Sequence, residues 1–157
     1  MRFPTLIRKG VERPIVAVTI ESEHGIRFTA DVLVDIGSDI TLFPLNLAEY
    51  LKIDVSNVAD SQLRSALGAT AKYRTREVFL ELRRPPDVFR WKASVGFIAR
   101  PMSYGILGTR GFFEFFNLRY HVREHWLDIE PSGPLPQKLA TIRYSGISLS
   151  LSGRGMG

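Results

Sequence analysis

The sequence has no cysteine among its 157 residues, which excludes a disulfide framework, a zinc–thiolate site and a cysteine nucleophile. It also lacks any apolar run near the roughly 18 residues of a membrane helix, since its longest apolar stretches are ones such as Ile15 to Val18. The first residues, Met1 to Pro4, lack the apolar segment of a signal peptide. We therefore expect a cytoplasmic protein that does not associate with membranes.

Acidic residues are absent from the last 27 positions, residues 131–157, which hold Lys138, Arg143 and Arg154. This segment supplies most of the formal net charge of +5, so residues 1–130 are nearly balanced. A nucleic-acid interface is therefore disfavoured, because it needs basic residues gathered on the folded body. Proline, glycine and serine are frequent after Pro131, so we expect a domain over 1–130 and a tail over 131–157, with one candidate strand at Ile142 to Leu151.

Strand signals dominate the body of the chain. Pro14 to Ile20 and Arg27 to Val34 are rich in β-branched residues and flank a His24-Gly25 turn, which predicts a hairpin. A second, longer hairpin is predicted around Gly68. Its arms and the further candidate strands are Gln62 to Leu67, Lys72 to Leu82, Ile40 to Phe43, Phe89 to Ile98, Leu118 to Val122 and Trp126 to Ile129.

Helix signals are few. Pro44 to Leu51 begins with proline and has two leucines four residues apart, which indicates one or two helical turns. Phe112, Phe115 and Phe116 have the spacing of one helix face, which predicts a short helix over Thr109 to Phe116. The pattern as a whole predicts an all-β barrel or sandwich.

The most informative segment is Val32 to Pro44, with the sequence VLVDIGSDITLFP. An apolar strand leads directly into Asp35, and Gly37 follows two residues later. A carboxylate at the end of a buried strand is costly, and the glycine is free to take an unusual backbone angle. The arrangement fits a functional carboxylate as well as an aspartate that begins a turn.

Two segments carry metal-ligating side chains at helical spacing. Asp31, Asp35 and Asp39 recur every four residues and would share one face of a helix, but their β-branched neighbours oppose a helix. His121 and His125 have the same spacing in a segment predicted as strand, turn and strand, which favours two surface histidines. We therefore expect neither a metal nor another cofactor.

The Asp35 segment resembles the active-site loop of retropepsin-like aspartic proteases, in which Asp-Thr/Ser-Gly-Ala/Ser follows two or three aliphatic residues. Ile106-Leu107-Gly108, about 70 residues downstream, is similar to the second signature of that family. The hairpin around Gly68 lies between the two signatures, where the family has its flap. The order of these parts over roughly residues 12 to 130 is more specific than any one motif.

The resemblance implies an acid-protease-like closed barrel with a flap hairpin and an aspartic endopeptidase activity without cofactor. That chemistry needs two carboxylates a hydrogen bond apart that share one proton and hold a water. The chain has one Asp-x-Gly loop, so the second Asp35 must come from a second copy in a homodimer. Its other partner would be a peptide or an unfolded protein.

The resemblance also assigns roles to individual residues. Asp35 would be the catalytic residue, in a loop with Ile36, Gly37 and Ser38, and the Ser38 hydroxyl would hydrogen-bond the carboxylate. Asp39 would contact the substrate backbone. The flap residues Leu67, Gly68 and Ala69 would close over the peptide and exclude water.

One position departs from the family pattern. Ile36 stands where the family has threonine or serine, whose hydroxyl bonds the partner loop, and isoleucine can neither donate nor accept a hydrogen bond. Ile36 therefore indicates a weak enzyme, a different locking contact, or a dimeric module of the same fold that binds peptides without cleaving them. The flap is also poor in glycine. A basic nucleic-acid-associated protein remains a third interpretation, which rests on charge alone.

Overall fold

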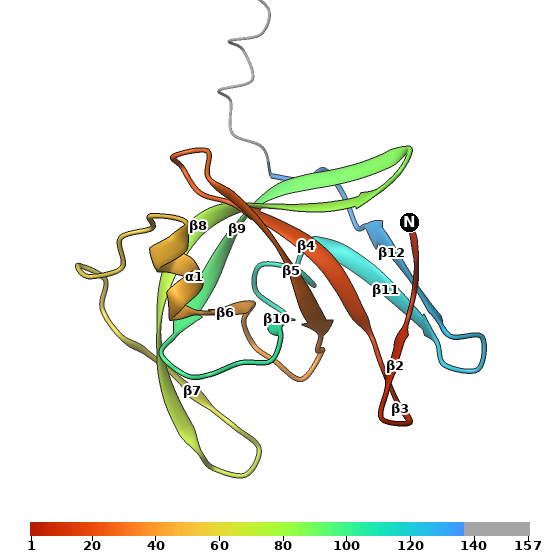
Figure 1. Ribbon diagram of the computed structural model, residues 1–157, viewed down its shortest axis with the longest axis horizontal. Helices are drawn as coiled ribbons and strands as arrows, with labels where there is room; N and C mark the ends of the chain where they lie inside the picture. Colours follow the sequence, from red (N-terminus) through yellow and green to blue (C-terminus); the bar gives the residue numbers. More distant parts are fainter. Residues whose placement is uncertain (137–157) are drawn as a thin grey trace, which may run out of the picture.

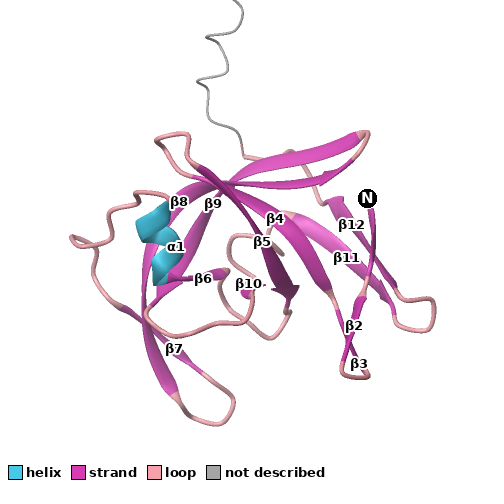
Figure 2. Ribbon diagram, in the orientation of Figure 1, coloured by secondary structure: helices cyan, strands magenta, loops and turns pink. Residues whose placement is uncertain are grey.

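The structure, a computed structural model, describes residues 1–136. Strands make up most of this part of the chain, and α1 (Leu45–Tyr50) is its one helix (Figure 2). The strands are β1 (Arg2–Pro4), β2 (Leu6–Arg8), β3 (Val11–Arg13), β4 (Ile15–Glu21), β5 (Arg27–Val34), β6 (Leu42–Pro44), β7 (Ser61–Arg64), β8 (Thr70–Arg84), β9 (Asp87–Ile98), β10 (Gly105–Leu107), β11 (Phe116–His121) and β12 (Trp126–Pro131). The prediction of an all-β fold with a short helix is confirmed. The candidate strand over Ile142 to Leu151 lies outside the described residues.

Seven strands form the main sheet, in the order β4-β5-β10-β6-β9-β8-β7 (Figure 1). β4 also pairs with β8, so the series of paired strands returns on itself. β1, β12 and β11 form a second sheet, and β2 pairs with β3 alone. β8 and β9 form a long hairpin, in which the strands pair from Arg84↔Asp87 to Tyr73↔Ile98.

The predicted hairpins are present. β4 and β5 pair antiparallel, and the turn between them contains Gly25 at φ +76°. β7 and β8 form the second hairpin, and Gly68 occupies its turn at φ +83°, a backbone angle that favours glycine. β11 and β12 form the third. Each of these hairpins joins two predicted strands across a short turn.

One helix prediction is confirmed and the other is wrong. α1 begins after Pro44, and its Leu47 and Ala48 are buried. In place of a helix, Arg110 forms an isolated bridge with Ile40, residues 111–115 form successive turns, and Phe116 begins β11. Gly111 lies at φ +91°, and the indole of Trp91 donates to its carbonyl at 2.8 Å, so the chain is held out of helical geometry there.

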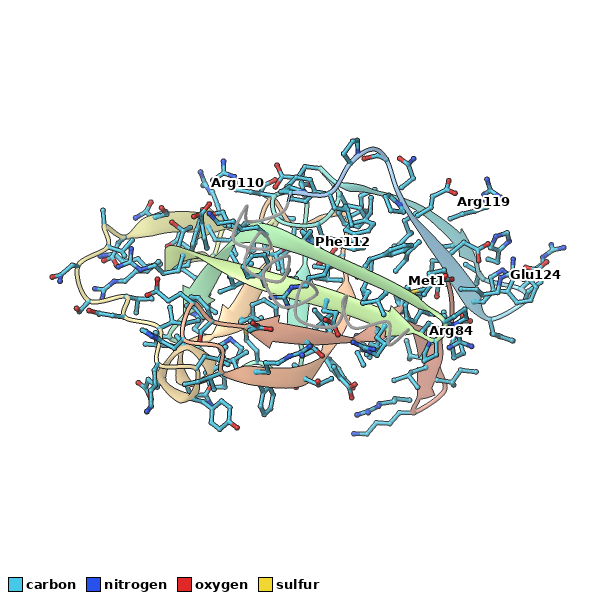
Figure 3. All side chains as sticks on the ribbon, turned by 90° about the horizontal axis from the view of Figure 1, so that it is seen from above. Met1, Arg84, Arg110, Phe112, Arg119 and Glu124 are labelled. Atoms are coloured by element: carbon cyan, nitrogen blue, oxygen red, sulfur yellow. The ribbon has the colours of Figure 1, made fainter. Side chains whose placement is uncertain are left out.

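The phenylalanines of this segment nevertheless pack as their spacing predicted, toward the core. Phe112 and Phe116 are buried, and their rings stack with centroids 5.0 Å apart. Trp91, fully buried on β9, meets the Phe116 ring edge-on at 4.7 Å. Phe112 lies within the molecule, whereas Arg110 and Arg119 point outward (Figure 3). This aromatic cluster supports the segment that follows β10.

Contacts far apart in the sequence join the N-terminal strands to the rest. β1 pairs with β12, with Phe3 opposite Leu127. Glu12 joins the β2–β3 hairpin to the β11–β12 turn. Its Oε2 lies 2.9 Å from Nδ1 of His125, and its Oε1 accepts a hydrogen bond from the Thr5 hydroxyl. No local pattern in the first 13 residues predicted these strands.

Candidate active site

Asp35 lies directly after β5, at the point where a buried strand opens into a loop. Val32 and Val34 on β5 are buried in the core, and Asp35 is half-buried. The amide of Asp35 donates to the carbonyl of Leu107 at 3.0 Å, and the amide of Gly37 donates to Oδ1 of Asp35 at 2.9 Å. Both the backbone and the carboxylate of Asp35 are thus held by backbone hydrogen bonds.

Glycine suits position 37 because it has no side chain, and not because of its backbone angle. Its φ lies outside the left-handed region, contrary to the unusual angle that we expected. A Cβ at this position would come 3.2 Å from Oδ1 of Asp35, which is tighter than ordinary side-chain contacts. Glycine therefore lets the amide approach the carboxylate closely.

The second signature lies beside the Asp35 loop, although about 70 residues separate the two. β10 pairs parallel with β5, with Ile106 opposite Leu33 and Leu107 opposite Val34. Gly108 then passes so close to the loop that a Cβ there would lie 2.4 Å from the carbonyl oxygen of Ile40. The two motifs that carried the resemblance therefore form one packed unit, and only glycine fits at the crossing point.

Thr41 is a residue of this unit that the sequence analysis missed. Its side chain is fully buried, and its Oγ1 accepts a hydrogen bond from the Gly108 amide at 3.1 Å. Its own amide donates to the carbonyl of Arg110 at 2.9 Å. Thr41 thus bonds the loop to the second signature. A lone hydroxyl residue within the apolar run ITLF is the signal that would have found it.

Ser38 is buried, and its hydroxyl donates to the carbonyl of Ile40 at 2.8 Å. The resemblance implied a bond from this hydroxyl to the carboxylate of Asp35, and the structure directs the hydroxyl into its own loop instead. The backbone of Ser38 bonds on both sides, since its amide donates to Asp35 and its carbonyl accepts from Thr109. Ser38 therefore stiffens the loop that presents Asp35.

Ile36 is exposed over 81% of its surface, whereas Ser38 and Ile40 in the same loop are buried. Asp39 is exposed as well, and its carbonyl accepts a hydrogen bond from the amide of Arg110 at 3.0 Å. The loop thus presents three features to solvent: the Asp35 carboxylate, the apolar Ile36 side chain and a second carboxylate at Asp39.

The flap candidates Leu67, Gly68 and Ala69 lie in the turn between β7 and β8. Leu67 is 98% exposed, and the turn is closed by its own hydrogen bonds, such as Ser65 amide to Ala69 carbonyl at 2.8 Å. Within residues 1–136, no hydrogen bond joins this turn to the Asp35 loop. Both lie on the lower side of Figure 1, separated from each other.

A hollow of about 640 Å³ lies beside α1 and β5, and Asp35 does not line it. Among its lining residues are Phe28, Tyr50 and Tyr104. In the part of the chain described, no three histidine, aspartate or glutamate residues are grouped to hold a metal ion. No helix of residues 1–136 is long and apolar enough to cross a membrane. Asp35 thus lies outside the hollow beside α1, in a loop whose Ile36 and Asp39 are exposed.

Comparison with known proteins supports the fold. The chain is similar to the crystal structure of a retropepsin-like aspartic protease from Rickettsia conorii, with a TM-score of 0.53 and 14% identity over 83% of this chain and 98% of that chain. Two viral structures give a TM-score of 0.41. They are the EIAV protease complexed with the inhibitor HBY-793 (17% identity; 66% of this chain, 88% of that chain) and the foamy viral protease-reverse transcriptase in complex with an RNA/DNA hybrid (13% identity; 90% of this chain, 16% of that chain). No family model matches the chain, and no curated protein matches it either.

The Rickettsia likeness, at this identity, shows that the chain has the fold of a retropepsin-like aspartic protease. The match covers 83% of this chain, so the likeness in fold extends over most of the described residues. It leaves the activity to be argued from the Asp35 loop itself.

Proposed function

We propose that the protein is an aspartic endopeptidase whose active site forms between two copies of the chain. The observation that carries the proposal is the packed unit around Asp35. The Asp35 carboxylate accepts a hydrogen bond from the Gly37 amide, the Asp35 amide donates to the Leu107 carbonyl, and Gly108 packs closely against Ile40 of the same loop. This packed arrangement, on a fold like that of a retropepsin-like aspartic protease, supports Asp35 as the catalytic residue.

The chemistry follows from bringing two such carboxylates together. Two like charges a hydrogen bond apart cannot both ionise easily, so the pair shares one proton and holds a water. The ionised carboxylate takes a proton from that water as the water oxygen attacks the peptide carbonyl, and the other donates its proton to the carbonyl oxygen, giving a tetrahedral diol. The carboxyl that took the water's proton then gives it to the leaving nitrogen as the C–N bond breaks, and a diol hydroxyl returns a proton to the other carboxylate. A chain with a single such loop can perform this only as a homodimer.

The distribution of exposed apolar side chains supports an interface on the same side as Asp35. The loop after β5 and the turns β2–β3, β7–β8 and β11–β12 lie on the lower side of Figure 1. Large exposed apolar residues lie in or beside each of them: Ile36, Leu67 and Val122 in the loop and turns, and Ile7 and Val11 on the strands of the β2–β3 hairpin. These side chains are spread over separate turns on the same side as Asp35. A second copy, with a peptide between the flaps, would cover them.

The deciding experiment compares Asp35→Asn with Asp31→Asn as its matched control. Asp31 lies on β5, four residues before Asp35, and among the described residues it forms one loose ion pair, of 3.9 Å to Arg8. We expect wild type and Asp31→Asn to cleave an unfolded protein at mildly acidic pH. Asp35→Asn should lose cleavage and keep the dimer, because amide and carboxylate have nearly the same shape.

A second candidate function is a dimeric module that binds extended peptides without cleaving them. The exposed Ile36, in place of a hydroxyl residue, is the observation that favours it. Absence of cleavage by the wild-type dimer between about pH 4 and 7 would decide for this module over the peptidase. Peptide binding by both wild type and Asp35→Asn would then be the remaining activity.

A further inference from the structure

We propose that the loop between β9 and β10, residues 99–104, docks an extended peptide segment of another protein. The peptide inserts an aromatic side chain into the hollow beside α1 and places a carboxylate against Arg100. The docking site is separate from the proposed active site, because Asp35 lines none of its hollows. The inference therefore applies to one copy of the chain and does not depend on cleavage.

Three hollows join into one groove along this loop. The first, of about 640 Å³, lies beside α1 and β5, and the second, of about 510 Å³, shares Pro44, Asn46 and Met102 with it. The third, of about 390 Å³, shares Ala99 and Arg100 with the second and reaches the β7–β8 hairpin. The groove is thus elongated along the loop, which suits an extended chain.

The backbone of the loop is available to bond such a chain. No backbone hydrogen bond joins residues 99–104 to the rest of residues 1–136. Peptides that bind in extended form gain affinity from main-chain hydrogen bonds, and pockets for their side chains supply specificity. The loop therefore offers main-chain donors and acceptors that a peptide can bond along its length.

The first hollow suits an aromatic side chain. Phe28 and Tyr50 line it, and their rings meet edge-on with centroids 5.4 Å apart. They are 42% and 59% exposed, so a further ring can reach them from solvent. Tyr104 lines the same hollow, and the guanidinium of Arg8 lies 5.3 Å from the centroid of its ring. An incoming aromatic ring would gain the edge-on and offset contacts that such rings favour.

Arg100 supplies the charge that selects an acidic peptide. Among residues 1–136 it forms no ion pair, and its Nη2 donates one hydrogen bond, to the carbonyl of Thr70 at 2.9 Å. Lys72, which lines the third hollow, is by contrast paired with Asp60 at 3.6 Å. A guanidinium presents N–H donors in a planar fork that matches a carboxylate. The exposed Arg100 can therefore bind an aspartate or glutamate of the partner.

The places of the two anchors set their spacing in the peptide. Met102 and Tyr104 both line the first hollow, two and four residues after Arg100. An extended chain spans at most about 3.5 Å per residue, so these residues lie within about 7 and 14 Å of Arg100. A peptide that runs along the loop would therefore carry its aromatic and acidic residues two to four positions apart.

The test measures the binding of a fluorescein-labelled peptide of glycine and serine that carries tryptophan and glutamate three positions apart, made in both orders. Fluorescence anisotropy gives its dissociation constant. We expect Tyr50→Ala to bind the peptide at least about threefold more weakly than wild type, because ring contacts are lost. Arg100→Gln should weaken binding by a similar factor, because the carboxylate loses its charged partner.

Two control variants change exposed side chains outside the groove. Val88→Ala removes apolar surface from β9, and Arg119→Gln removes a guanidinium that points outward from β11 (Figure 3). Neither should change the dissociation constant. Tyr50 and Arg100 are exposed as well, so all four variants should unfold at the temperature of wild type.

Changes in the peptide show which groups meet. When glutamine replaces its glutamate, Arg100→Gln should cost no further affinity, because the pair is already broken. When alanine replaces its tryptophan, Tyr50→Ala should likewise cost nothing more. Raising the salt from about 50 to about 500 mM should weaken binding to wild type more than binding to Arg100→Gln, because exposed ion pairs are screened.

Each outcome decides the inference. Absence of binding of either peptide at millimolar protein overturns it, and so does binding that Tyr50→Ala or Arg100→Gln leaves unchanged. Asp35→Asn should bind the peptide as wild type does. Loss of binding in that variant would assign the peptide to the Asp35 loop and overturn the docking site. A wild type that binds the peptide but cleaves no protein supports the docking site and refutes the peptidase, so the two proposals fail separately.

Discussion

Gly108 shows at the scale of one residue how tightly the site is assembled. Its Cα lies where any side chain would meet the backbone of the Asp35 loop, since a Cβ would come 2.4 Å from Ile40 O and 2.8 Å from Ser38 O. We predict that Gly108→Ala lowers the free energy of unfolding by about 3 kcal/mol, because backbone must move to admit the methyl group. Urea denaturation measures the change.

Gly133→Ala is the matched control for this prediction. No atom lies within 4 Å of the position that its Cβ would take. The control should change the free energy of unfolding by less than about 0.5 kcal/mol. Equal stability of the two variants would show that the loop and β10 are not packed as described. The comparison thus tests the assembly of the site without relying on any activity.

At the scale of elements, Glu12 joins the β2–β3 hairpin to the β11–β12 turn. The hydrogen bond from Thr5, together with His125, holds the pKa of Glu12 below its ordinary value. The stabilisation is complete above the ordinary pKa of about 4.5 and is lost as the pH falls through the lowered value. We predict that Glu12→Gln loses less stability than wild type between pH 6 and pH 3, measured by thermal unfolding at both values.

Glu124→Gln provides the comparison for this charge. Glu124 is an exposed glutamate in the same β11–β12 turn, so its loss should leave the acid sensitivity of wild type in place. If both variants respond to acid as wild type does, the link between the two hairpins contributes nothing to stability. Other carboxylates with lowered pKa values, such as Asp60 beside Arg74, account for the sensitivity that remains in Glu12→Gln.

The elements that sequence predicted are those whose cause is local. β-branched residues on either side of His24-Gly25 predict β4 and β5, and Pro44 with Leu47 predicts α1. The helix expected at Phe112 fails because Gly111 takes φ +91° under a hydrogen bond from Trp91, 20 residues away. The pairing of Phe3 with Leu127 is equally remote. Local periodicity contains no information about such partners.

The candidate site divides in the same way. Asp35 stood out from its own neighbours in the sequence, as a carboxylate after an apolar strand. The family resemblance singled out Gly108 as part of a second signature, and the parallel pairing of β10 with β5 then shows that it lies beside the Asp35 loop. The buried hydroxyl of Thr41 emerged only from the fold, since its partner Gly108 lies 67 residues away. Residues that act through remote contacts are thus the ones that a single sequence conceals.

At the scale of the whole molecule, the chain holds one Asp35 loop and therefore half of the proposed active site. Mixing the two kinds of half-site tests this directly. Wild type mixed and equilibrated with a ninefold excess of Asp35→Asn places about nine tenths of the wild-type chains in mixed dimers. Because a mixed dimer lacks the second carboxylate, we predict that peptidase activity per wild-type chain falls to about one tenth. The measurement is cleavage of an unfolded protein at a fixed wild-type concentration.

The control is the same excess of an Asp35→Asn chain that also carries a charged residue at position 36. Because that charge would oppose pairing of the two loops, we expect this mixture to keep the activity of wild type alone. Undiminished activity in the first mixture would mean that one chain carries a complete site.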